Sequence, residues 1–87
     1  MSAIAFEVEQ AGCESCAVRV REAVSQLAPV AAVLIDAAAD EATVTLERGT
    51  AANESDLNRV LLEASAGSGH TYRVRPGSIR AASEDVS

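Results

Sequence analysis

The sequence predicts an α+β fold, in which a four-stranded antiparallel sheet carries two helices on one face. Short segments in which apolar and polar side chains alternate indicate strands. Two longer segments carry apolar side chains at three- and four-residue spacing, which indicates helices with one buried stripe. The segments follow one another in the order β-α-β-β-α-β, and two successive β-α-β units form a split sheet of this kind.

The first half of the chain contains a strand, a loop and a helix. Residues 4–8 alternate apolar with small or acidic side chains, as in a half-buried strand. The apolar signal pauses over residues 9–15, which we expect to form a loop. A helix is predicted over residues 16–27, because Pro29 then prevents it from continuing. Its apolar stripe consists of Cys16, Val20, Ala23, Val24 and Leu27.

Two strands are predicted in the middle of the chain. Residues 30–35 are rich in β-branched side chains and are bounded by a proline and an aspartate, which favours a strand. Residues 42–46 alternate Ala-Thr-Val-Thr-Leu, which is the clearest strand pattern in the chain. Residues 36–41 are expected to form the turn between them, and residues 48–53 a loop.

A second helix and a last strand complete the pattern. Ser55 is predicted to cap the helix. Its apolar stripe consists of Leu57, Val60, Leu61 and Ala64. The Gly-rich residues 66–69 end the helix, and residues 70–74 are expected to form the final strand, with Tyr72 and Val74 facing the core.

Length limits the chain to one small domain, because 87 residues cannot form a second core. Residues 76–87 have little apolar content and are expected to be a disordered C-terminal tail. The prediction is therefore a single ferredoxin-like domain over residues 1–75.

Composition excludes two classes of function. Seven Arg, no Lys and thirteen acidic residues give a net charge of −6, which would repel phosphate, and Phe6 and Tyr72 are the only aromatic residues for stacking bases. We therefore expect no nucleic-acid binding. So short a chain can hardly build both a core and a deep substrate pocket, so we expect no enzyme.

Segments for export or membrane insertion are not predicted. The first 16 residues carry three Glu and no basic start, and the longest apolar run, residues 28–35, is far short of about 20 residues. We therefore expect a cytoplasmic protein without membrane insertion, in which the two cysteines stay reduced.

The feature that points to a function is Cys13-Glu14-Ser15-Cys16, at the predicted junction of a loop and a helix. Two thiols at this spacing can face one point in solvent, and the unpaired N–H groups of a helix start favour their thiolate forms. Three interpretations are open: two cysteines buried as small apolar residues, a thiol–disulfide redox site, or a metal site.

Metal binding suits the available side chains best. Thiolates are soft ligands that select Cu(I), Zn(II) or a similar soft ion. A structural zinc site normally has four Cys or His ligands, whereas the chain offers Cys13, Cys16 and His70. Cu(I) needs only two or three ligands. A redox site of the thioredoxin type would call for an aromatic residue before the first Cys, where this chain has Gly12.

A longer pattern surrounds the cysteines, formed by Val8, residues 12–16, Val20, Ala23, Leu27, residues 29–30 and residues 33–36. In this pattern, and in element order over about residues 4–74, the chain resembles the heavy-metal-associated domain. That family contains small copper chaperones, mercury carriers and N-terminal modules of metal-pumping P-type ATPases. The resemblance implies a ferredoxin-like fold with the metal held by Cys13 and Cys16. It also implies a partner, either a metal-transporting P-type ATPase or another C-x-x-C protein, and either a monomer or a metal-bridged dimer.

Three positions depart from the family pattern. Ala11 stands where the family usually has a Met packed beneath the loop, so we expect different packing there. Gly12 stands where zinc- and cadmium-type members often have an acid, which favours a monovalent ion. The loop before the last strand ends in Gly69-His70, which is similar to cyanobacterial-type copper chaperones, in which a His can reach the copper. If Gly67 is the matching glycine instead, His70 is displaced from the site.

His70 therefore has two interpretations, a solvated residue of a surface loop or a third ligand that completes a Cys₂His site. The predicted function is a Cu(I) chaperone that holds the ion between Cys13 and Cys16. It would pass the ion to a partner's dithiol by ligand exchange, without making or breaking a substrate bond. The alternatives are a Zn(II), Cd(II) or Hg(II) carrier or sensor module on the same fold, and a thiol–disulfide redox protein.

Overall fold

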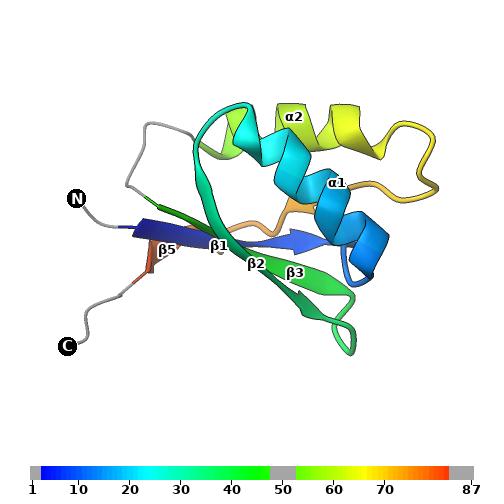
Figure 1. The fold of residues 1–87 in the computed structure, drawn as a ribbon, viewed down its shortest axis with the longest axis horizontal. Helices are drawn as coiled ribbons and strands as arrows, with labels where there is room; N and C mark the ends of the chain where they lie inside the picture. The colour runs from blue at the N-terminus through cyan, green and yellow to red at the C-terminus, as the bar shows by residue number, and fades with distance from the viewer. Residues whose placement is uncertain (1–2, 48–52, 83–87) are drawn as a thin grey trace.

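A computed structural model describes residues 3–47 and 53–82 and has the predicted α+β architecture. Its elements are β1 (Ala3–Glu9), α1 (Glu14–Ser25), β2 (Val30–Asp36), β3 (Glu41–Leu46), α2 (Glu54–Ser65), β4 (Arg73–Val74) and β5 (Arg80–Ala82). The strands form one antiparallel sheet in the order β2-β3-β1-β4, and both helices lie on one face of it (Figure 1). The ferredoxin-like prediction is confirmed. Among the described residues, no helix is long and apolar enough to cross a membrane.

The fourth position of the sheet is shared by two short strands. Along β1, β4 pairs with Val8 and Glu9, whereas β5 pairs with the first three residues of that strand. The chain leaves the ladder at Pro76, which has no N–H to donate, and turns through Gly77 at a φ of 78°. The structure thus differs from the disordered tail predicted over residues 76–87, because residues 80–82 return to the sheet. Residues 83–87 lie outside the described residues, as do residues 48–52 of the predicted loop.

The hydrophobic core lies between the sheet and the two helices. On β1 and β3, Phe6 is paired with Val44 and Val8 with Ala42, so these four side chains share the face that the helices cover. The largest fully buried side chains are Tyr72, Phe6, Leu46, Leu57, Leu61, Val8, Val20, Val24, Val44 and Val74. They include Val20 and Val24 of the first predicted stripe, Leu57 and Leu61 of the second, and both residues expected to face inward from the last strand. Leu27 and Ala64, which the stripes also contained, are only partly buried.

Capping residues shift the helix limits away from the predicted ones. The first helix begins at Glu14 rather than at residue 16, because the extended Cys13 acts as its N-cap. The second begins at Glu54, because the side chain of Asn53, and not that of Ser55, accepts a hydrogen bond from the first turn. The predicted strand over residues 70–74 is paired only over its last two residues.

An ion pair connects β5 to β1 on the face of the sheet that the helices do not cover. The guanidinium of Arg80 donates to both carboxylate oxygens of Glu7, at 2.9 and 3.0 Å, and the hydroxyl of Thr43 donates to one of them at 3.2 Å. The bond from Arg80 holds the pKa of Glu7 below its ordinary value, with a smaller lowering from the Thr43 bond, although partial burial acts in the opposite direction.

This ion pair predicts a pH-dependent contribution to stability. A carboxylate whose pKa is lowered by folding stabilises the fold at pH values above its unfolded-state pKa of 4.5. This stabilisation is lost as the pH falls through the pKa of the folded state. Arg80→Ala is therefore expected to lower the free energy of unfolding at pH 7 by about 0.5–1 kcal/mol, since the pair is partly in water. Urea unfolding should show the difference shrinking below pH 4.5. Arg59→Ala, which removes a 3.6 Å contact to Asp56 on the exposed side of α2, is the control. A difference that stays constant with pH would contradict the assignment.

Candidate metal centre

The two cysteines lie at the start of α1, and their surroundings differ. Cys13 is exposed, whereas Cys16 is only 2 % exposed and belongs to the hydrophobic core. Their Cα atoms are 5.1 Å apart. Sγ of Cys13 accepts a hydrogen bond from the N–H of Cys16 at 3.3 Å, in the way an N-cap side chain satisfies the first turn. One sulfur is thus anchored by packing while the other faces solvent.

The structure joins Cys13 and Cys16 in a disulfide, whereas reduced thiols were predicted. The physical reason is proximity, since residues three apart at a helix start bring their side chains together on one side. A disulfide has no thiolate to offer to a metal. Two electrons must therefore be supplied by an external reductant, which breaks the S–S bond and gives two thiolates, before these sulfurs can act as ligands.

The fold brings His70 to the cysteines. The β1–α1 connection, the β2–β3 turn and the α2–β4 loop gather at the right-hand end of the molecule in Figure 1. One ligand atom from each of Cys13, Cys16 and His70 lies within 4.8 Å of the other two. An ion shared by sulfur and imidazole needs a separation of at most about 4.3 Å, the sum of a metal–sulfur and a metal–nitrogen bond. Small side-chain rotations would therefore bring the ligand atoms within bonding distance of one ion. His70 lies beside the cysteines. A family match at Gly67 would instead have implied that His70 is displaced from them.

Two local contacts hold His70 within its loop. The hydroxyl of Ser68 accepts a hydrogen bond from the main-chain N–H of His70 at 3.1 Å. The imidazole is stacked on the ring of Tyr72, with centroids 6.0 Å apart and an interplanar angle of 13°. Tyr72 itself is buried, and within the described part of the chain its hydroxyl has no hydrogen-bond partner. The core residue Tyr72 thus orients the exposed end of the loop.

The turn between β2 and β3 holds the cysteine loop from the other side. Asp40 accepts hydrogen bonds from the N–H of Ala11 through its carbonyl, at 3.1 Å, and from the N–H of Gly12 through its carboxylate, at 3.2 Å. A Cβ at Gly12 would lie 2.6 Å from the Cα of Asp40. The glycine before Cys13 is therefore required by this close approach, and any acid in its place would collide with the turn.

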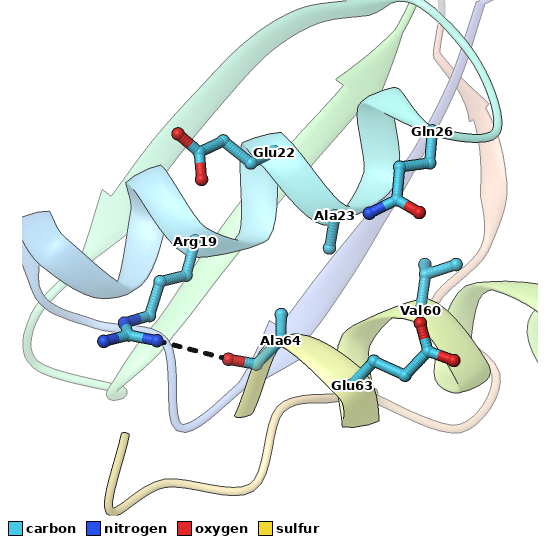
Figure 2. A pocket seen from close by; sticks show the side chains of 7 residues that line it. All are labelled: Arg19, Glu22, Ala23, Gln26, Val60, Glu63 and Ala64. Carbon is cyan, nitrogen blue, oxygen red and sulfur yellow. Dashed lines mark hydrogen bonds between the residues drawn. The ribbon is translucent and has the colours of Figure 1, made fainter. Parts of the chain in front are cut away.

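An open groove of about 230 Å³ lies between the helices (Figure 2). It is lined by Arg19, Glu22, Ala23, Gln26, Val60, Glu63 and Ala64. The guanidinium of Arg19 crosses it and donates to the carbonyl of Ala64 at 3.5 Å, which links α1 to the last turn of α2. Cys13, Cys16 and His70 do not line the groove, so it is separate from the metal centre.

The heavy-metal-associated domain model matches residues 5–67, which is more than half of the chain. The chain belongs to the heavy-metal-associated domain family. This family comprises metal-binding and metal-transport domains, so binding of a heavy metal is its general property. No curated protein matches the sequence.

Two solved structures share the fold of this heavy-metal-associated domain. One, described as "Crosstalk between Cu(I) and Zn(II) homeostasis", is 20 % identical, with 82 % of this chain and 97 % of that chain covered and a TM-score of 0.55. The other is oxidized MerP from Ralstonia metallidurans CH34, also 20 % identical, with 85 % and 99 % covered and a TM-score of 0.52. At this identity the likeness shows the fold alone.

Two residues near the centre whose backbone conformations are unusual were missed in the sequence. Gln10 and Asp40 both have left-handed backbones, with φ values of 61° and 55°. An Asp in a turn tolerates this conformation, so Asp40 could have been suspected at the end of its Ala-rich turn. Gln10 carries no such signal, because glutamine has no preference for a positive φ.

Proposed function

We propose that this heavy-metal-associated domain is a Cu(I) chaperone that binds the ion through Cys13, Cys16 and His70. The observation that carries the proposal is the gathering of two sulfurs and one imidazole within 4.8 Å, with no carboxylate in the cluster, among the described residues. Soft sulfur donors favour Cu(I), and three ligands are one fewer than a structural zinc site normally has. The glycine before Cys13 supports the same choice, because it puts no carboxylate at the position where zinc- and cadmium-type members often have one.

The unequal exposure of the sulfurs supports transfer to a partner. A thiolate from another protein can approach the ion from the side of the exposed Cys13, forming a copper–sulfur bond before an original one breaks. Cys16, anchored in the core, keeps the ion in place during the approach. We propose as partner a second C-x-x-C protein, such as the metal-binding module of a P-type ATPase. We also propose a cytoplasmic location, since a reducing compartment keeps the dithiol available.

An anaerobic titration tests the choice of metal. The fully reduced protein is expected to bind one equivalent of Cu(I) in competition with a Cu(I) chelator, and to retain it when Zn(II) is added in excess. The protein carrying the Cys13–Cys16 disulfide is the control and is expected not to bind Cu(I), because it has no thiolate. Displacement of the copper by Zn(II) would favour the divalent carrier or sensor instead. Zn(II) is the divalent ion to test, because one structure of the same fold is described as concerning both Cu(I) and Zn(II) homeostasis.

A thiol–disulfide redox role is the second candidate, and the disulfide itself favours it. An exposed sulfur followed by a buried one at a helix start is an arrangement in which the exposed thiolate can attack another disulfide. Turnover in an insulin-reduction assay would support this role, and tight Cu(I) binding without turnover would support the chaperone.

A further inference from the structure

Gln10 lies at the end of β1 in a left-handed conformation, with a φ of 61°. This conformation is unfavourable for a side chain such as glutamine, so the surrounding structure must hold it. The conformation also ends the β1–β4 ladder, whose last pair is Glu9 with Arg73. Beyond that pair, the main chain of β1 turns away and no longer offers a carbonyl to the α2–β4 loop.

The side chain of Gln10 replaces the missing ladder bond. Its Oε1 accepts a hydrogen bond from the main-chain N–H of Thr71 at 3.1 Å. Among the hydrogen bonds of the described residues, this one alone connects residues 10–16, which contain both cysteines, with residues 66–72, which contain His70. Ser68 orients His70 within its own loop, and Tyr72 anchors the end of that loop in the hydrophobic core that also contains Cys16. The Gln10–Thr71 bond is therefore the polar link between the part of the loop that carries His70 and the cysteine segment.

We propose that Gln10 is a positioning residue that keeps His70 within reach of the bound ion. With the Gln10–Thr71 bond, Cu(I) has two sulfurs and one imidazole nitrogen as ligands. Without it, the loop moves away and the ion keeps the two sulfurs alone. Gln10 therefore determines the coordination number and the tightness with which the ion is held before transfer. This inference rests on the proposed Cu(I) function.

Gln10→Met tests the inference, because methionine keeps the length of the side chain and removes the carbonyl acceptor. X-ray absorption of the reduced, Cu(I)-loaded full chain is expected to show two sulfurs and one nitrogen in the parent and two sulfurs in the variant. Cu(I) affinity is expected to fall about tenfold, as when a residue that orients a metal ligand is removed. Gln26→Met, at the exposed C-cap of α1, is the matched control and is expected to leave both readouts unchanged.

A double-mutant cycle with His70→Ala separates positioning from general folding. If Gln10 acts through His70, Gln10→Met causes no further loss of Cu(I) affinity once His70 is alanine. An equal loss in both backgrounds would overturn the proposal, and so would a nitrogen ligand retained in the Gln10→Met protein. In the metal-free protein, the amide proton of Thr71 is expected to exchange faster in Gln10→Met, and unchanged exchange would also overturn it. Failure of the parent protein to bind Cu(I) would instead reject the proposed function, which distinguishes the two.

Discussion

Cys13→Ser and Cys16→Ser are both expected to weaken Cu(I) binding by more than about a hundredfold, because each removes a ligand rather than an outer contact. Their effects on folding are expected to differ. Serine is a favoured N-cap residue, so Cys13→Ser preserves the start of α1. Cys16 is buried in the core, and a hydroxyl there without a partner is expected to lower the free energy of unfolding by about 1–3 kcal/mol.

These two variants are measured under reducing conditions, so that the disulfide contributes to neither comparison. Anaerobic Cu(I) titration gives the affinities, and urea unfolding gives the stabilities. Ser15→Ala is the control, because it lies between the cysteines with its Oγ 3.5 Å from Sγ of Cys13 and leaves both thiols in place. Retention of parental Cu(I) affinity by either cysteine variant would reject the two-sulfur site. Equal destabilisation of both would contradict their different burial.

Gly12→Ala is expected to destabilise the protein and to disturb the metal centre together. Its new Cβ would lie 2.6 Å from Cα and 3.0 Å from the carbonyl carbon of Asp40, and these main-chain atoms cannot rotate away. The β2–β3 turn and the cysteine loop must separate, which breaks the bonds from Asp40 to Ala11 and Gly12. We expect the free energy of unfolding to fall by about 1–3 kcal/mol and Cu(I) affinity to fall about tenfold.

Gly77→Ala is the matched control for this change. A Cβ at Gly77 meets nothing within 4 Å, but its φ of 78° is unfavourable for alanine, so the expected cost is about 1–2 kcal/mol. Because Gly77 lies in the β4–β5 turn, Cu(I) affinity should not change. Urea unfolding and Cu(I) titration of both variants make the comparison. If Gly12→Ala left stability and affinity unchanged, the close packing of the cysteine loop against Asp40 would be wrong.

Most of the fold could be predicted from local patterns, because each pattern reports a buried face. The alternation over residues 42–46 and the stripe containing Val20 and Val24 correspond to β3 and α1, and these side chains are buried as expected. The helix starts were less predictable, because they depend on which side chain reaches the first turn. Asn53 and Cys13 both do so, and neither was distinguishable from its neighbours by hydrophobicity alone.

The C-terminal segment could not be predicted for a different reason. Residues 80–82 have too few apolar side chains to indicate a strand, and they pair with β1 because that strand has an open edge beside them. The bond from Arg80 to Glu7 then adds a contact between residues far apart in the sequence. Pairing of this kind depends on the partner strand, which the local sequence does not contain.

The sequence by itself determined the pair of sulfurs, because Cys13 and Cys16 are three residues apart and a helix start brings such neighbours together. Only the tertiary structure decided that a ligand atom of His70 lies near their sulfurs, that Gln10 accepts a hydrogen bond from the loop of His70, and that Asp40 leaves no room for a Cβ before Cys13. The physical reason is distance along the chain. Local spacing sets the geometry of neighbours, whereas contacts between three separate loops exist only once the sheet has aligned the strands that carry them.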